Sequence, residues 1–400
     1  MSLHQIHQKK TDLKKFFFTN KNIKIQSLAY SLNLFLPTLI LLFSSFFKNY
    51  NLTAELGILI GINIIFTQIF SSNARSIIIS KKSVGSIFSY IIFRVIISIF
   101  IILANLFFFN FLEFSKNFIL FQISIMIIFQ WLIELILTFF ELKKKIKEFY
   151  FYIFFAFIFI IALLIDFIYF QNLRYIFFVY NIFLFLFLFI SFFKLKKNKI
   201  NLKSILSYTL TSKAFFSSLA ISFANLIWRL FIIYFCGKIL AGIYFASFAI
   251  GSLPGTLFNN TFGPTMIKNN INFDKNYKFL IICFNIIMFF LLILILRNKD
   301  LIFVEFYYTQ IFGTFISLIG SVFMLRSQYI RQYIIQKTSH QSRIFKIDIF
   351  YSLLVILIVP TLYFIGDEKL IIISFLSSSV VSFIVYNLIS YRRLKNNEFN

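Results

Sequence analysis

KLKKNKINLKS, from Lys194 to Ser204, is the longest basic linker in the chain. Apolar runs broken by charged or Asn-rich stretches predict six membrane-spanning helices before this linker and six after it. Because six is an even number, both halves would enter the membrane in the same direction, as parallel repeats do. The linker therefore indicates an all-α polytopic membrane protein with about 12 transmembrane helices in two six-helix lobes.

We expect the first lobe at residues 25–193 and the second at 205–391, with 194–204 as the linker and with cytoplasmic tails at 1–24 and 392–400. The individual spans are expected near residues 25–47, 54–72, 86–109, 115–140, 148–170, 174–193, 211–235, 239–263, 277–297, 301–325, 345–365 and 369–391.

The composition excludes a soluble protein. Of the 400 residues, 60% are hydrophobic and only 13% are charged, and the mean hydropathy is +0.87. At about 20 apolar residues per crossing, the predicted helices leave almost no chain for a soluble catalytic domain. The two cysteines, Cys236 and Cys283, lie in apolar runs and match no metal-ligand spacing. We therefore expect no metal and no other cofactor.

The 39 Lys and Arg residues test the helix count independently. Most of them lie in the two tails and in alternate loops on one side of the predicted membrane, which the positive-inside rule identifies as cytoplasmic. Topology thereby explains the net charge of +25, with anionic membrane lipids as its partners and no role for nucleic acid. The first 24 residues lack the apolar core of a signal peptide. We expect a multi-pass protein of a bacterial inner (plasma) membrane with both termini in the cytoplasm.

Several enzyme classes lack the features that they would need. The predicted external loops are short, whereas membrane glycosyltransferases and polysaccharide polymerases usually carry a sizeable external loop. The three histidines, His4, His7 and His340, fall in cytoplasmic segments, away from any membrane-embedded acyltransferase or zinc site. The sequence contains no Walker motif. Gradient-driven or facilitated transport, without catalysis, is the function that remains.

A charge inside a predicted span is costly unless it faces water or a partner, so such residues are functional candidates. Arg94 and Glu134 lie at similar depths on antiparallel helices, so they either form a structural ion pair or line a cavity. Arg229 lies too deep in the seventh span to reach the interface easily. Lys213 lies near the inner end of that span, where it can extend to the interface. Arg75, after the second span, is either a topological charge or a cation at the inner mouth of a cavity.

The seventh span carries a polar stripe formed by Ser218, Ser222, Asn225 and Arg229. Their spacing of i, i+4, i+7 and i+11 places all four on one face of a helix. Such a stripe on an otherwise apolar helix indicates a water-filled lumen. The alternative is that Ser and Asn join helices by hydrogen bonds while Arg229 reaches a main-chain carbonyl.

Three acidic residues lie near helix ends: Asp166 and Glu305 at the outer side, and Asp348 at the inner side. Interfacial water is expected to solvate them, so a structural role is favoured for each. Asp166 is nevertheless the first residue to test for proton or sodium coupling.

Prolines interrupt two predicted spans. Pro37 lies in the first, and Gly251, Pro254 and Gly255 cluster in the eighth. A broken backbone ladder is tolerated in a membrane only where protein or a cavity satisfies the freed groups. These positions are therefore candidate hinges or parts of a binding site, with ordinary proline kinks as the alternative.

The stretch NLIWRLFIIYFCGKILAGIYFASFAIGSLPGTLFNNTFGPTMIK, Asn225 to Lys268, contains an Arg-bearing helix, a short turn and a Pro-interrupted helix. It resembles the opening helix pair of the C-terminal lobe in the O-antigen and polysaccharide flippases of the multidrug/oligosaccharidyl-lipid/polysaccharide (MOP) exporter superfamily. The pair from NLFLPTLILLFSSFF to NARSIIIS resembles its N-terminal counterpart.

This resemblance implies a V-shaped pair of lobes around a cationic central cavity. The substrate would be an oligosaccharide linked through pyrophosphate to a polyprenol, and other glycan-assembly membrane proteins would be candidate partners. By the same resemblance, Arg229, Arg94 and Arg75 would bind pyrophosphate or acidic sugars, with Lys213 as a weaker contributor, because arginine presents a bidentate fork to phosphate. Pro37 would let the first helix bend during alternating access.

Two other functions stay open. A membrane-embedded enzyme of glycan assembly, such as an O-antigen polymerase, would need a folded external segment. A small-molecule antiporter of the same superfamily would be expected to use acidic cavity residues such as Asp166 rather than arginines.

Overall fold

The computed structural model describes residues 21–71, 75, 78, 84–111, 114, 117–170, 173–195, 213–258, 304–337 and 341–387. Every regular element in these residues is helical. Nine helical segments within them are long and apolar enough to cross a membrane. The prediction of an all-α polytopic membrane protein is confirmed.

We call the helices from Lys21 to Phe193 the first lobe and those from Lys213 to Ile384 the second lobe. The apolar runs of the first lobe end at short turns. At the turn between the first two, Lys48 adopts a positive φ of 61° and the side chain of Asn49 accepts a hydrogen bond from the Leu52 amide over 3.3 Å. The described helices of this lobe are α2 (Lys21–Phe46), α3 (Tyr50–Ser71), α5 (Val84–Phe111), α6 (Asn117–Leu142), α7 (Ile146–Ile165), the π-helical turn η1 (Asp166–Phe170) and α8 (Leu173–Phe193).

The second lobe contains longer helices, two of which break inside. In α10 (Lys213–Leu257) the break is at Gly237, whose φ of 73° suits a residue without a Cβ. We call residues 213–236 the first arm of α10 and residues 238–257 the second arm. The other elements are α13 (Val304–Lys337), α14 (Gln341–Leu370), which breaks at Gly366 and Asp367, the short η4 (Ile371–Ile373) and α15 (Ser374–Ile384).

All of the expected spans except the ninth coincide with these helices. The ninth, 277–297, lies outside the described residues, as does the NNTFGP stretch at 259–264. One boundary was wrong, because α13 continues from the expected end at residue 325 to Lys337. No Gly or Pro interrupts residues 321–337, so the helix extends beyond its apolar part. Arg326 and Arg331, which were expected in a loop, therefore lie on a helix.

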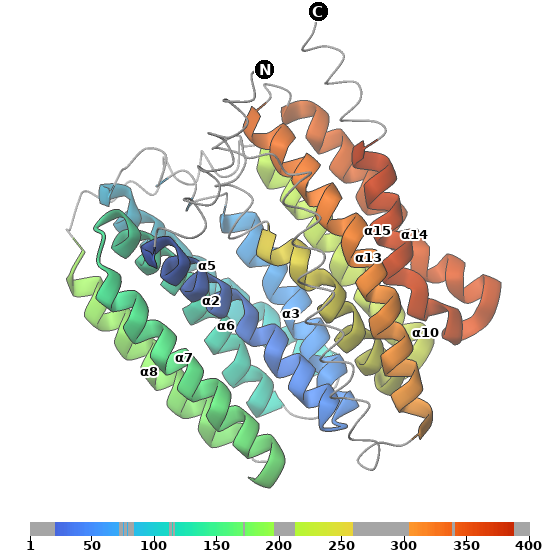
Figure 1. Ribbon diagram of the computed structural model, residues 1–400, viewed down its shortest axis with the longest axis horizontal. Coiled ribbons are helices and arrows are strands. Elements are labelled where there is room, and N and C mark those ends of the chain that lie inside the picture. Colours follow the sequence, from blue (N-terminus) through green and yellow to red (C-terminus); the bar gives the residue numbers. More distant parts are fainter. Residues whose placement is uncertain are drawn as a thin grey trace, which may run out of the picture.

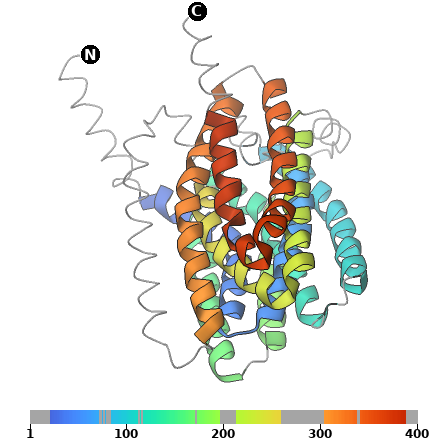
Figure 2. The ribbon, with the colours of Figure 1, turned by 90° about the vertical axis from the view of Figure 1, so that its right-hand side faces the viewer.

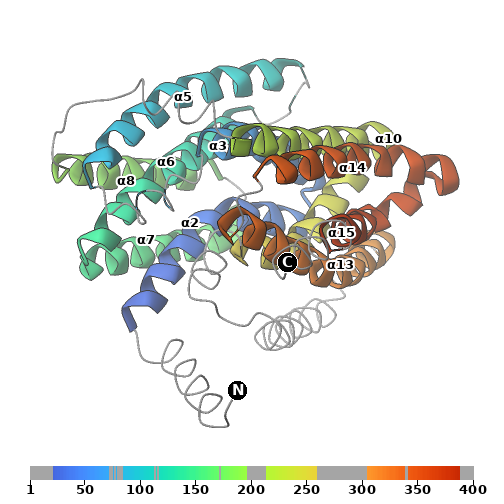
Figure 3. The same ribbon diagram turned by 90° about the horizontal axis from the view of Figure 1, so that it is seen from above.

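The two lobes lie side by side and meet along α3 and α10 (Figures 1 and 3). The long helices of the second lobe stand beside one another in the turned view of Figure 2. We call the end of the molecule that carries the turn Lys143–Lys145 and Lys194 the basic end, and the other the opposite end. α3 runs from the opposite end toward the basic end, and the first arm of α10 runs in the reverse direction.

Burial divides the first lobe into a centre and a lipid-type surface. Nearly all residues of α6 from Trp131 to Phe140 are buried. The helices α7 and α8 instead expose large apolar side chains, including Phe154 and Val179. Such faces suit contact with lipid tails, whereas the buried centre holds the polar groups of the lobe.

Candidate functional site

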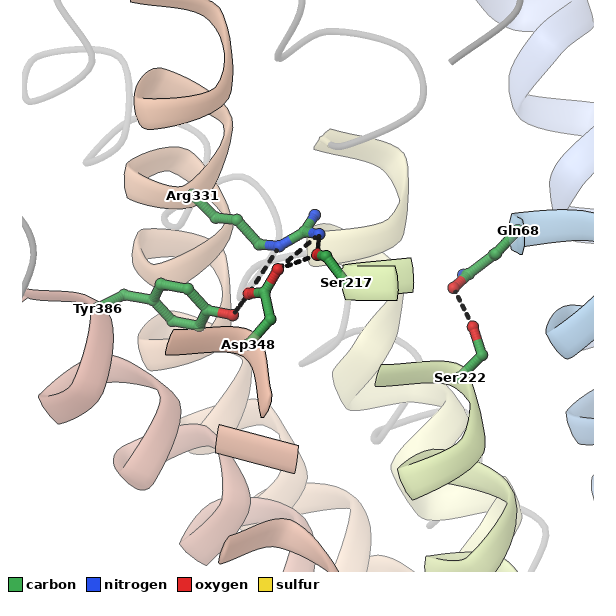
Figure 4. Close-up of polar contacts among 6 residues, drawn as sticks. All are labelled: Gln68, Ser217, Ser222, Arg331, Asp348 and Tyr386. Atoms are coloured by element: carbon green, nitrogen blue, oxygen red, sulfur yellow. Dashed lines mark hydrogen bonds and ion pairs between the residues drawn. The ribbon is translucent and has the colours of Figure 1, made fainter. Parts of the chain in front are cut away.

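The polar stripe of α10 faces α3 across the boundary between the lobes. Ser222 Oγ donates a hydrogen bond to Gln68 Oε1 of α3 over 2.9 Å (Figure 4). Two turns further along, Arg229 Nη1 donates to the main-chain carbonyl of Gly57. The guanidinium carbon of Arg229 also lies 5.8 Å from the centre of the Phe245 ring. The stripe therefore brings its arginine to the junction of the two lobes.

Two glycines of α3 make this close approach feasible. A Cβ on Gly61 would lie 3.4 Å from Cδ of Arg229 and 3.2 Å from Cδ1 of Leu226. A Cβ on Gly57 would overlap the ring of Phe245. A larger residue at Gly61 would push the first arm of α10, with the Arg229 guanidinium, away from α3. A larger residue at Gly57 would push the second arm away.

Arg229 has no anionic partner among the described residues. It is half-buried, and no carboxylate oxygen in that part of the chain lies within 4.0 Å of its guanidinium. A carbonyl and an aromatic ring supply only partial negative charge. A guanidinium with partial compensation at a lobe junction is chemically suited to bind an anion.

The remaining polar members of the stripe keep free hydrogen-bonding groups. Ser218 and Asn225 are half-buried, and within the described residues neither side chain makes a hydrogen bond. Their apolar neighbours Leu219 and Phe223 are 39% and 52% exposed. Polar groups and an exposed apolar surface thus lie next to each other on the first arm of α10.

Arg94 and Glu134 form the ion pair that was one of two expectations. Arg94 Nη1 of α5 lies 2.9 Å from Glu134 Oε2 of α6 and also donates to the carbonyl of Trp131. The Arg94 side chain is 1% exposed and its guanidinium lies over the Trp131 ring, 4.7 Å from the ring centre. Glu134 is 26% exposed. Arg94 is thus enclosed by its partners in this conformation, and only the carboxylate is accessible.

Arg75 belongs to a second cation–carboxylate cluster nearer the basic end. Its Nη2 lies 3.4 Å from Glu141 Oε2, and its guanidinium carbon lies 3.6 Å from the centre of the Tyr30 ring. The Tyr30 hydroxyl donates to the same Glu141 oxygen over 2.9 Å. Arg75 and Glu141 are both partly exposed. The sequence did not single out Glu141, although its spacing from Glu134 places both acids on one face of α6.

A third charged network lies at the basic end of the second lobe (Figure 4). Asp348 of α14 is fully buried and accepts hydrogen bonds from Ser217 of α10, from Tyr386 after α15, and from Nε and Nη2 of Arg331 of α13, the last two over 3.3 and 3.2 Å. Arg331 Nη2 also donates to Ser217 Oγ over 2.9 Å. One carboxylate thus joins four segments of the lobe.

The expectation that interfacial water solvates Asp348 and Asp166 was wrong. α14 begins at Gln341, so Asp348 lies two turns inside the helix and faces its neighbours. Asp166 is 3% exposed because the helix continues past it as η1, which keeps the carboxylate away from the helix end. Lys213 is the first residue of α10, but its side chain, like that of Glu305, lies outside the described residues.

The candidate hinges lie in continuous helix. Pro37 lies inside α2 and Pro254 inside the second arm of α10. A Cβ on Gly251 would lie 2.6 Å from the carbonyl oxygen of Ser317 in α13, so this glycine allows close packing of the two helices. The breaks that the structure does contain lie at Gly237 and at Gly366–Asp367, near the opposite end. A hinge role for the prolines stays a prediction.

Comparison with known proteins shows which solved structures share this arrangement of helices. No protein-family profile and no curated protein sequence matches the chain. Among solved structures, an inward-facing multidrug resistance MATE family transporter of the MOP superfamily is similar, with a TM-score of 0.57, 12% identity and 95% of each chain covered. The eukaryotic MATE transporter AtDTX14 has a TM-score of 0.53 and 10% identity, with 93% of this chain and 95% of that chain covered.

The chain has the fold of MATE transporters. The expected likeness to structures of the MOP superfamily is thereby confirmed for the fold alone. The flippase branch stays a prediction, and so does the role of each arginine.

Proposed function

We propose that this protein is a membrane transporter that moves a polyprenyl-pyrophosphate-linked oligosaccharide across a bacterial inner membrane by alternating access. Its basic end and both termini would lie in the cytoplasm, and no bond of the substrate would be made or broken. The observation that carries the proposal is the half-buried guanidinium of Arg229 at the lobe junction, which no described carboxylate neutralises.

The depth of Arg229 favours a substrate that enters the membrane-embedded part of the protein. At 1.5 Å per residue, Arg229 lies roughly 24 Å from Lys213 at the start of α10 and roughly 12 Å from the break at Gly237. A phosphate oxygen would replace a neutral carbonyl as the acceptor of the guanidinium, and an anionic phosphate can also accept two parallel N–H bonds from arginine. Arg229 would then release Gly57 when it binds substrate.

The surroundings of the arginine suit an amphiphilic substrate. Ser218 and Asn225 offer hydrogen-bonding groups for sugar hydroxyls, since both are half-buried and bond to no described residue. Leu219 and Phe223, on the adjacent face, expose apolar surface that a prenyl chain could contact. Arg75, at the basic end, would meet the anionic head group first. In this proposal Lys213 supports the positive potential, and Arg94 would contribute only when its pair with Glu134 opens.

A small-molecule antiporter is the second candidate. It is favoured by the partly exposed carboxylates of Glu134 and Glu141 in the first lobe, which could attract an organic cation. The similar structure named as a multidrug resistance transporter agrees with this alternative. The glycan polymerase that the sequence left open has less support, because the fold is that of transporters.

Vesicles reconstituted with the purified protein would test the proposal. We expect the protein to move a fluorescent prenyl-pyrophosphate-linked oligosaccharide between leaflets, and Arg229→Gln to slow this at least about tenfold, the effect of losing one charge-assisted bond. Arg174→Gln is the matched control, because Arg174 is exposed and lies over the Phe118 ring, away from the lobe junction.

Movement of an organic cation against a proton gradient, with no movement of the lipid-linked sugar, would instead support the antiporter. If Arg229→Gln and the unmodified protein move the lipid-linked oligosaccharide at equal rates, Arg229 is not part of the substrate-binding site.

A further inference from the structure

The end of α3 that lies away from the basic loops is enclosed on all sides. Every residue from Leu52 to Leu59 is buried, whereas the residues from Ile64 to Gln68 are partly or fully exposed. We call Leu52–Leu59 the α3 plug. The contrast within one helix means that the space beside α3 is filled at the opposite end and less so toward the basic end.

Both lobes contribute to this enclosure. A Cβ on Gly242 would overlap the carbonyl of Tyr50, so the second arm of α10 touches the backbone of α3 at its first turn. Gln310 Nε2 of α13 donates a hydrogen bond to Ser45 Oγ of α2 over 3.1 Å. Figure 1 shows α2 and α13 separating from there toward the basic end. The lobes are therefore held together at the opposite end.

The plug contains one charged side chain, that of Glu55. Glu55 is 1% exposed, and its Oε1 lies 3.9 Å from Nζ of Lys238, whose side chain is 40% exposed. Lys238 follows Gly237, the positive-φ residue between the two arms of α10. The pair therefore joins the first lobe to the second at the level of the plug.

The two members of the pair lose different amounts of hydration. A fully buried carboxylate loses most of its water, and removing a nearby cation takes away part of the compensation for that cost. A half-exposed lysine keeps much of its hydration and loses little when its partner is removed. The closed plug thus depends more on Lys238 than on Glu55, because the carboxylate regains water as soon as the lobes separate.

We propose that the opposite end of the transport path stays closed only while Lys238 compensates the buried carboxylate of Glu55, and that separation of the two side chains opens this end. The inference rests on the proposed function only in that it requires alternating access by movement of the two lobes, and it holds for any substrate. Glu55 is a positioning residue in this scheme, since it sets how readily the plug opens and does not contact the substrate.

Accessibility of a reporter cysteine in the plug tests the proposal directly. In a chain with Cys236→Ser and Cys283→Ser, Ala54→Cys provides the reporter, because Ala54 is fully buried in the plug. The rate of labelling by a membrane-impermeant thiol reagent, added from the side of the opposite end, is measured in the reporter background. Lys238→Gln, Glu55→Gln and the double variant are then compared with it.

We expect Lys238→Gln to raise the labelling rate about tenfold, because it leaves the buried carboxylate with less compensation. Glu55→Gln should leave the rate the same or lower. The double variant should return to the background rate, which a partly unfolded protein would not do. Lys194→Gln is the matched control, because it removes the more exposed Lys194–Glu148 pair at the basic end and should have no effect.

The proposal is overturned if Lys238→Gln labels at the background rate, or if the double variant labels as fast as Lys238→Gln alone. Labelling needs no substrate, so this outcome is independent of the flippase assignment. If the labelling follows the expected pattern but no lipid-linked sugar moves in vesicles, then only the proposed function fails.

Discussion

Arg331 and Arg229 are both carried by helices of the second lobe, but their surroundings differ. Arg331 is paired with the fully buried Asp348 in a network that also includes Ser217 and Tyr386. Arg229 donates to a main-chain carbonyl and lies beside an aromatic ring, and no described carboxylate is close. A fully paired buried charge holds helices together, whereas an incompletely paired one remains able to bind a ligand. We therefore assign a structural role to Arg331 and propose a binding role for Arg229.

Breaking the network around Asp348 should have the largest effect on stability. Asp348→Ala leaves the Arg331 guanidinium and two hydroxyl groups without their shared acceptor, which we expect to cost about 3–5 kcal/mol. Thermal unfolding in detergent measures this as a lowered midpoint. Combining Asp348→Leu with Arg331→Met removes both charges and should recover a large part of the loss. An Asp348→Ala protein as stable as the native one would contradict the structural role.

Breaking the Arg94–Glu134 pair in the first lobe should have a smaller effect on stability. Arg94→Met leaves Glu134 without its partner, but that carboxylate is 26% exposed and regains some water. We expect a loss of about 2 kcal/mol in the same unfolding measurement. Glu134→Gln should cost more than Arg94→Met, because it leaves the Arg94 guanidinium, whose side chain is 1% exposed, without its carboxylate. A smaller cost for Glu134→Gln would contradict this account of the pair.

The hydrogen bond between the lobes should have the smallest effect. Ser222→Ala removes the donor to Gln68, which is exposed and can bond to water instead. We expect a loss of about 0.5–1 kcal/mol. Ser218→Ala is the matched control, since Ser218 makes no hydrogen bond within the described residues and should leave the unfolding midpoint unchanged. A larger loss for Ser218→Ala would indicate a partner for this stripe residue.

The fold could be predicted from the sequence because long apolar runs specify membrane helices directly. The charged networks were harder to predict, since each depends on which helices meet. Arg331 was assigned to a loop because its surroundings are polar, and only the continuation of α13 to Lys337 brings it to Asp348. If the sequence had been predicted to be helical at Arg331, Asp348, two turns into the next helix, would have been a candidate partner.

The polar stripe of α10, in contrast to the charged networks, could be predicted in part from the sequence. The spacing of Ser222 and Arg229 correctly predicted a shared helical face, since both contact α3. Periodicity could not predict which helix would face the stripe. It also could not predict that Gly57 and Gly61 would let α3 approach α10 so closely. Glu55 was also missed, because an acid near the end of an apolar run is expected to reach water, and the enclosure by the second lobe depends on contacts distant in sequence.

The central claim is that Arg229 binds the anionic group of the substrate, and ligand-induced stabilisation tests it most directly. A short-chain prenyl pyrophosphate should raise the unfolding midpoint of the native protein. It should have little effect on Arg229→Gln, whose own midpoint in the absence of ligand should be close to native. Equal stabilisation of the two proteins by the ligand would contradict the claim and would place the anion at another group.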